Sequence, residues 1–150
     1  MRCRRQAVLA AFISLVALVT TARSAPPAFS YGTIRPSCAP WDGAAIGITL
    51  TREPVGCKGT SESFLSIGVW RGLPLQPGQV VKFAAGSDGG FASRCRKEGE
   101  CERAQSGTIT FDRYEGGAGA SGRYELHFKN DETLSGTFDV KWCAERVICG

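Results

Sequence analysis

The feature that most limits how this chain can fold is an alternation of apolar and polar side chains near its C-terminus. Residues 123–129 and 137–142 each place every second side chain on one side of an extended segment. Because successive side chains of a β-strand point to opposite faces of a sheet, each segment predicts a strand with one buried and one wet side. The turn-forming residues 130–133 between them predict an antiparallel pair. The predicted buried face consists of Tyr124, Leu126, Phe128, Phe138, Val140 and Trp142.

The rest of the chain predicts more short strands and no helix. Apolar alternation recurs over residues 44–51 and 64–70, residues 79–85 predict another strand, and residues 91–111 predict a charged hairpin. No stretch of about ten residues beyond the N-terminal segment has the 3.6-residue period of a helix. We expect an all-β fold: a single antiparallel β-sandwich, or a small barrel, of about seven or eight short strands that is stapled by disulfides.

Three further segments complete this expectation. Residues 25–43 are rich in proline and small side chains, which is typical of an irregular lead-in. Residues 115–122 are rich in glycine and predict a flexible connection. Residues 107–114 are expected to continue the second arm of the charged hairpin.

The N-terminus predicts export. Arginines at the very start precede an apolar run, residues 7–19, and small residues follow it at Ala22 and Ser24. This run is shorter than the roughly 20 residues that a membrane-spanning helix needs. We expect a signal peptide at 1–24, cleaved after Ser24, and a single disulfide-stapled β-domain at 25–150, periplasmic or extracellular and without a membrane anchor. An arginine-, alanine- and glycine-rich composition favours a bacterial source.

Cleavage of the signal peptide would change the charge balance. The full chain has 18 basic and 14 acidic residues, for a formal net charge of +4. Four arginines and no acidic residue lie in the predicted signal peptide, so 14 basic residues would face 14 acidic ones. A nucleic-acid binder needs a concentrated basic face, because contacts with phosphate supply most of its affinity. We therefore expect no nucleic-acid partner.

The cysteines predict a disulfide framework. Of the seven, Cys3 would leave with the signal peptide, and an even number in a short exported chain is typical of disulfide pairing. We expect Cys95 to pair with Cys101, because only five residues separate them. We also expect at least one bond to tie the two ends of the domain together. The other four cysteines, which allow three pairings, are Cys38, Cys57, Cys143 and Cys149.

Residue patterns offer little support for catalysis. His127, the single histidine, falls on the polar side of its predicted strand beside Glu125, and we expect it to point outward. Ser121 lacks the strand-to-helix turn of a nucleophile elbow. One histidine with oxidised cysteines makes no familiar zinc site. We therefore expect no metal, no cofactor and no catalytic residue.

Binding is the function that the sequence favours. The charged hairpin, held by the predicted Cys95–Cys101 bond, resembles no catalytic motif but could serve as a braced recognition loop. Tryptophans at strand boundaries are frequent anchors of partners. We expect an exported, soluble binding module, of the inhibitor or immunity type, that recognises a macromolecule through this hairpin. The expected contact residues are Arg96, Lys97, Glu98, Glu100, Trp41 and Trp70.

Other interpretations stay open. The tryptophans could instead close the ends of the core, and the charges of the hairpin could simply keep it solvated. A protein that binds a glycan or a small ligand through an aromatic platform or a barrel mouth is the first alternative function. A hydrolase with a pair of carboxylates is the second, and it ranks last because no motif supports it.

Overall fold

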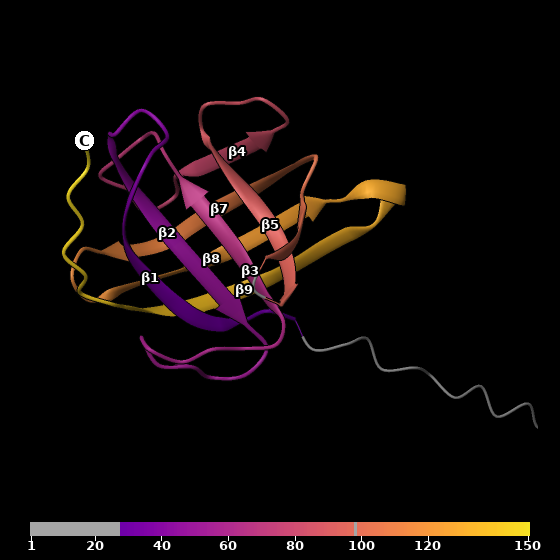
Figure 1. Ribbon diagram of the computed structural model, residues 1–150, viewed down its shortest axis with the longest axis horizontal. Helices are drawn as coiled ribbons and strands as arrows, with labels where there is room; N and C mark the ends of the chain where they lie inside the picture. Colours follow the sequence, from indigo (N-terminus) through magenta and orange to yellow (C-terminus); the bar gives the residue numbers. More distant parts are fainter. Residues whose placement is uncertain (1–27, 98) are drawn as a thin grey trace, which may run out of the picture.

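A computed structural model of the protein describes residues 28–97 and 99–150, shown in Figure 1. The predicted signal peptide, its cleavage site and Glu98 lie outside these residues, as does the side chain of Lys97. Within these residues, a short 3₁₀ turn, Lys129–Asp131, interrupts an otherwise all-β fold. The strands are β1 (Tyr31–Cys38), β2 (Ala44–Thr51), β3 (Phe64–Val69), β4 (Val80–Ala84), β5 (Gly90–Lys97), β6 (Glu100–Arg103), β7 (Ser106–Glu115), β8 (Gly119–His127) and β9 (Thr133–Trp142).

These nine strands form one mixed sheet in the order β4-β7-β8-β9-β1-β2-β3-β5-β6. The all-β prediction is confirmed, but the sheet does not close, and neither a sandwich nor a barrel is confirmed. The expectation of a wholly antiparallel sheet is wrong, because β1 and β9 pair in parallel at Thr33 with Lys141 and at Ile34 with Trp142. No hairpin joins these two strands, so nothing local forces them to run in opposite directions.

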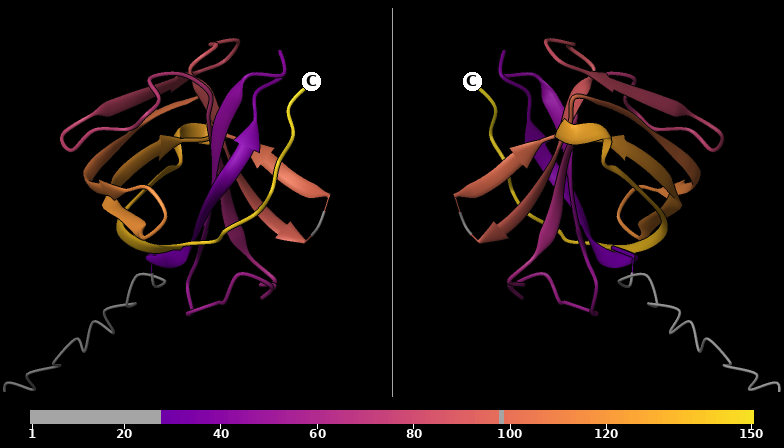
Figure 2. Two further views of the ribbon diagram at one scale, coloured as in Figure 1. Left: turned by 90° about the vertical axis from the view of Figure 1, so that its left-hand side faces the viewer. Right: turned by 90° about the vertical axis from the view of Figure 1, so that its right-hand side faces the viewer.

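The continuous sheet bends so that its two ends approach each other. In Figures 1 and 2, β1, β2, β3 and β5 make one layer, and β7, β8 and β9 cross behind them. Side chains from both layers, among them Ile48, Leu65 and Phe111, belong to one hydrophobic core. The link from β6 to β7 bridges the layers, because Ala104 N–H donates to the carbonyl of Ala92 at 2.9 Å and Gln105 N–H donates to that of His127 at 2.8 Å.

The predicted buried face near the C-terminus is confirmed. Five of its six apolar side chains are at most 3% exposed, and Trp142 is half-buried against the margin of the core. The single histidine points away from this core, as expected, with 44% of its side chain exposed. The alternation therefore identified correctly which side of β8 and β9 is covered.

Three local expectations are wrong. The supposed lead-in contains β1, whose Ile34 is fully buried between two partner strands; proline and small residues concealed it. The second arm of the hairpin ends at Arg103, and β7 instead pairs with β4 and β8. The glycine-rich connection is a tight turn, and residues from Gly119 onward belong to β8. Gly122 is needed there, because a Cβ atom on it would lie 2.0 Å from the carbonyl oxygen of Thr110.

Three disulfides staple the chain. The predicted Cys95–Cys101 bond is present. The other two bonds join residues 111 and 86 positions apart, so the prediction that the ends are tied together is also confirmed. Within the described ranges, no helix is long and apolar enough to cross a membrane. The remaining pairs are Cys38–Cys149 and Cys57–Cys143.

Candidate functional site

Four hydroxyl side chains line up across the outer face of β1, β2, β3 and β5, the side opposite the core. The register pairs Thr33 with Thr49, Thr49 with Ser66, and Ser66 with Ser93. Because neighbouring strands lie about 4.8 Å apart, this hydroxyl row spans roughly 14 Å. Thr33 and Ser93 are 9% and 8% exposed, so the two ends of the row lie deep in the surface. The row gives the outer face a floor of small polar groups.

Cations extend this hydroxyl row at both ends. Lys141 on β9 pairs with Thr33, and Arg103 on β6 pairs with Ser93. Arg35 lies two residues beyond Thr33 and therefore on the same face of β1. The outer face thus combines hydroxyl groups with positive charge, which favours ligands that carry oxygen acceptors.

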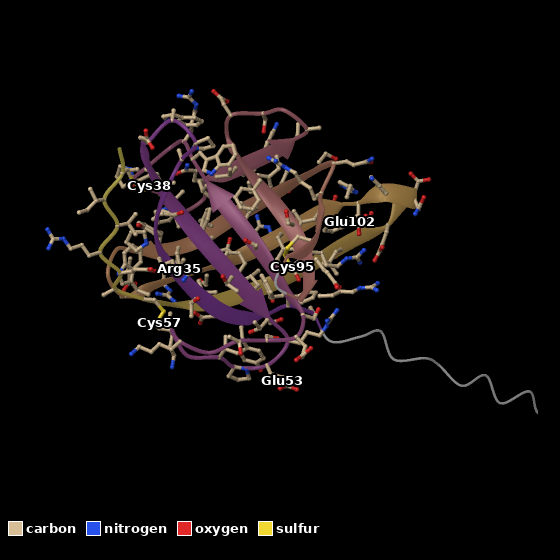
Figure 3. All side chains as sticks on the ribbon, in the orientation of Figure 1. Arg35, Cys38, Glu53, Cys57, Cys95 and Glu102 are labelled. Atoms are coloured by element: carbon tan, nitrogen blue, oxygen red, sulfur yellow. A yellow bond between two sulfur atoms is a disulfide. The ribbon has the colours of Figure 1, made fainter. Side chains whose placement is uncertain are left out.

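The borders of the outer face are covalently fixed. Figure 2 shows the β5–β6 hairpin and the C-terminal segment, residues 143–150, standing out on the same side of the layer. The C-terminal segment is joined to Cys38 at the end of β1 and to Cys57 in the loop of residues 52–63. Figure 3 places Arg35 between Cys38 and Cys57 on this side. Because these borders are cross-linked, a ligand would have little loop to order on binding.

A cluster of aromatic rings and guanidinium groups occupies one corner of the outer face. Trp41 meets Trp70 edge to face, with ring centroids 5.9 Å apart and planes at 84°. Trp70 in turn contacts Phe91, at 5.7 Å and 50°. The guanidinium of Arg71 lies 4.8 Å from the ring centroid of Trp41, and that of Arg103 lies 5.6 Å from the ring centroid of Phe91. We call these five residues the aromatic–arginine corner.

Glycine on β3 allows this corner to lie flat on the sheet. A Cβ atom on Gly68 would come within 2.4 Å of the Phe91 ring and 3.1 Å of the indole nitrogen of Trp70. Both rings therefore rest directly over the backbone of β3. By contrast, 47% of Trp41 is exposed, so the corner presents a large aromatic side chain to solvent.

A pocket of about 850 Å³ lies at the opposite end of the outer face. Its floor includes Thr33, Thr49 and Arg35 from the first two strands, and the loop of residues 52–63 forms its wall. Cys57 lines the pocket, so the Cys57–Cys143 bond fixes that wall to the end of β9. The volume lies within the range of about 300–1,000 Å³ that is typical of small-molecule sites.

An ion-pair network holds the hairpin from the inner side. Arg94 on β5 donates to Glu102 on β6, with Nη2 2.7 Å from Oε2, and contacts both carboxylate oxygens of Glu132. Its guanidinium also lies 4.8 Å from the ring centroid of Phe128. The hydrogen bond from Arg94 holds the pKa of the Glu132 carboxyl below its usual range. Figure 3 labels Glu102 in this region.

The predicted contact residues fall into two separate areas. Trp41 and Trp70 come together in the aromatic–arginine corner. Arg96 and Glu100 are exposed at the tip of the hairpin, at the far end of β5 from Phe91. The tip and the corner are linked through β6, because Arg103 reaches from this strand to Phe91.

Sequence reasoning missed the hydroxyl row, Phe91 and Arg103. The row had a visible signal in Thr49 and Ser66, which alternate with buried apolar residues on their strands. The alignment of the row across the strands had no such signal in the sequence. The register between strands that are far apart in the sequence leaves no local pattern.

The single histidine takes part in a small polar cluster on β8 and β9. His127 Nε2 lies 3.2 Å from Glu125 Oε1, and Nδ1 lies 3.1 Å from the hydroxyl of Thr133. These contacts orient the ring on the exposed side of the sheet. In the part of the chain that the structure describes, no three His, Cys, Asp or Glu side chains gather as a metal site would require.

Comparisons of this chain with protein-family models, with curated proteins and with solved structures find no match. The features that bear on function are those of the outer face itself: the hydroxyl row, the pocket at one end and the aromatic–arginine corner at the other.

Proposed function

We propose that this protein is an exported binding module of the bacterial envelope or exterior, and that it binds another protein through the aromatic–arginine corner. The observation that carries the proposal is the contact of Trp70 with both Trp41 and Phe91, each of which has a guanidinium group over its ring. Tryptophan and arginine dominate the energetic centres of protein interfaces. Three disulfides suit a protein of an oxidising compartment such as the periplasm or the cell exterior.

The chemistry of this corner favours a protein over a glycan. A sugar ring stacks on an open aromatic face, whereas guanidinium groups already lie over the rings of Trp41 and Phe91. Arg71 is paired with Asp88 at 2.6 Å. Among the residues with defined positions, no carboxylate pairs with Arg103. The complementary partner would therefore offer an apolar anchor to Trp41 and a carboxylate to Arg103.

The hairpin would contribute rigidity and additional contacts. Both the Cys95–Cys101 bond and the Arg94 network fix β5 against β6, so Arg103 is held over Phe91 before a partner arrives. When less of the chain has to become ordered on binding, the entropic cost is smaller and the affinity is higher. Such a braced surface suits an inhibitor or immunity-type module. In this proposal the tip residues Arg96, Lys97, Glu98 and Glu100 extend the binding surface.

Capture of the partner by matched variants tests the proposal. The tagged protein, expressed at its native level, would be recovered together with bound proteins, which quantitative mass spectrometry identifies. Tyr31 provides the control, because it is an aromatic residue with the same 47% exposure as Trp41. We expect one protein at near-equal amount with the wild type and with Tyr31→Ala, and its loss with Trp41→Ala. Equal recovery with Trp41→Ala, or no enriched protein at all, would contradict the proposal.

A double variant at the tip tests the role of the hairpin separately. Substitution of Arg96 and Lys97 by glutamine removes two positive charges, and Arg96 is exposed. We expect weaker binding of the captured partner with a nearly unchanged melting temperature. Unchanged affinity would confine the interface to the aromatic–arginine corner.

A further inference from the structure

The pocket at the far end of the outer face is lined by a threonine whose hydroxyl has no partner among the described residues. Thr33 lines the pocket and is 9% exposed, and its hydroxyl makes no hydrogen bond with any residue placed in the structure. Yet no side-chain oxygen or nitrogen that is cut off from solvent is unpaired in the described ranges. The hydroxyl of Thr33 must therefore open into the pocket, since that is the space which it lines.

Further polar groups converge on the same space. Thr49, directly opposite Thr33 on β2, also lines the pocket, and its hydroxyl likewise makes no hydrogen bond within the described chain. Thr51 differs, because its hydroxyl donates to the carbonyl of Glu53 at 2.6 Å. Thr33 and Thr49 thus leave two hydroxyl groups on the floor of the pocket to serve a ligand, each able to donate and to accept.

Arg35 supplies the positive charge of the pocket. Its Nη1 lies 3.5 Å from Oε2 of Glu145 in the C-terminal segment, and 47% and 53% of the two side chains are exposed. A long, exposed contact of this kind contributes little free energy, so the carboxylate of a ligand can replace that of Glu145. It also shows that a carboxylate can approach this guanidinium across the border of the pocket.

The remaining walls suit a small ring with several hydroxyl groups. Phe64 and Val55 offer apolar surface, and Glu62, which also lines the pocket, can accept hydrogen bonds. Serine and threonine are scarce at the energetic centres of protein interfaces, so this end of the face does not resemble a protein-docking site. Sugars combine apolar ring faces with hydroxyl groups, and a carboxylate on the ring would match Arg35.

We propose that this pocket binds a sugar that carries a carboxylate, with Arg35 holding the carboxylate and Thr33 and Thr49 holding ring hydroxyl groups. The site shares no residue with the aromatic–arginine corner, so the inference does not depend on the proposed protein partner. The Cys57–Cys143 bond keeps the wall of the pocket in place. The hydroxyl row leads from the pocket toward β5, where further rings of an oligosaccharide would lie.

Three probes separate the contributions of the carboxylate and of the hydroxyl groups. The oxidised mature protein would be titrated with D-glucuronate, D-glucose and acetate while amide chemical shifts are recorded by NMR. We expect saturable shifts with glucuronate, centred on residues 33–35 and 49–51. Glucose should bind about ten- to hundredfold more weakly, because it lacks the charge-assisted contact. Acetate, which lacks the ring, should give no saturable shifts.

Four variants assign these contacts to residues. Arg35→Gln should reduce the affinity for glucuronate to that for glucose, and Glu145→Gln should raise it by up to about fivefold by removing the competing carboxylate. Thr49→Val keeps the β-branched shape of the strand residue and should weaken both sugars roughly two- to tenfold. Thr137→Val is the matched control, since Thr137 is exposed on β9 in the other layer. It should change neither affinity.

Three results would contradict the inference. Absence of saturable chemical-shift changes with glucuronate at millimolar concentration would show that the pocket does not bind this sugar. Equal affinity for glucose and glucuronate would remove the assignment to an acidic sugar. Shifts that are unchanged in both Arg35→Gln and Thr49→Val would place the ligand elsewhere. Because Trp41→Ala should leave glucuronate binding intact, failure of the protein-binding proposal and failure of this one can be told apart.

Discussion

Arg94 and Glu132 form a two-point ion pair across 38 residues of sequence, with Arg94 Nη2 3.0 Å from Glu132 Oε2. Arg94 lies on β5, and Glu132 precedes β9. The pair therefore connects β5 to the turn between β8 and β9, which belong to the other layer. Only 19% of the Arg94 side chain is exposed, and among the ion pairs of the described chain only that of Arg94 with Glu102 is better shielded from water.

Glu132→Gln should lower the melting temperature at neutral pH and have less effect in acid. The bond to Arg94 lowers the pKa of the Glu132 carboxyl in the folded protein. A group with a lowered folded pKa stabilises the fold above its unfolded pKa, about 4.3 for glutamate, and this stabilisation is lost as the pH falls below that value. Thermal melts of both proteins between about pH 7 and pH 3 would measure the difference.

The control for this experiment is Glu53→Gln. Glu53 is exposed in the loop of residues 52–63, where Figure 3 labels it. Its substitution should leave the melting temperature unchanged at every pH. A difference between Glu132→Gln and the wild type that stays constant from neutral pH to acid would show that the ion pair does not contribute as described.

Gly68→Ala should disrupt the aromatic–arginine corner. The new methyl group would lie 2.4 Å from the ring of Phe91, so that Phe91 and Trp70 must move. Overpacking of this kind costs about 1–3 kcal/mol of folding free energy. Chemical denaturation would measure the stability, and tryptophan fluorescence would report the displacement of Trp70.

Gly47→Ala is the matched control, because Gly47 pairs directly with Gly68 on the same face. A Cβ atom on Gly47 meets its nearest neighbour at 3.6 Å, an ordinary contact. We expect stability between unchanged and about 1 kcal/mol higher, with unaltered fluorescence. Equal effects of the two substitutions would contradict the packing described for the corner.

The three disulfides should differ in their contribution to stability. Cys38–Cys149 closes a loop of sequence separation 111, whereas Cys95–Cys101 closes one of separation 6. Since the restriction of the unfolded chain grows with loop length, and the intact Cys57–Cys143 bond shortens the loop that Cys38–Cys149 closes, replacing the first pair by serines should cost about 3–4 kcal/mol and replacing the second about 2 kcal/mol. Urea denaturation of the two double variants gives the comparison. A larger loss for the Cys95–Cys101 pair would reverse this ranking.

Tyr124→Phe should destabilise the segment that leads into β1. The backbone N–H of Phe29 donates to the hydroxyl oxygen of Tyr124 at 3.2 Å, and Phe29 is fully buried. Removal of the acceptor leaves a buried N–H group unpaired, which costs about 1–3 kcal/mol. Tyr31→Phe changes an exposed hydroxyl and should have no measurable effect in the same denaturation experiment. Matching stabilities of the two variants would show that the buried bond is dispensable.

Local patterns explain which parts of this fold the sequence could predict. The core face of β8 and β9 follows from alternation alone, because apolar and polar residues alternate along each strand and the apolar ones are buried. The Cys95–Cys101 bond follows from a spacing of six residues. In both cases the interacting groups are close in the chain, so no knowledge of strand order is needed.

The features that escaped prediction depend on partners far apart in the sequence. β1 is recognisable only beside β2 and β9, and its parallel pairing with β9 joins opposite ends of the chain. The contact of Trp41 with Trp70, and that of Arg103 with Phe91, likewise require the order β2-β3-β5-β6. The candidate site is therefore a property of strand order and register, which short sequence motifs do not encode.

A footprint of the captured complex tests the binding proposal most directly. Hydroxyl-radical labelling of the free protein and of the complex, read by mass spectrometry, measures the protection of each exposed aromatic side chain. We predict that the partner protects Trp41, Trp70 and Phe91 and leaves Tyr31 as reactive as in the free protein. Protection of Tyr31 with unchanged labelling of Trp41 would contradict the assignment of the aromatic–arginine corner as the binding surface.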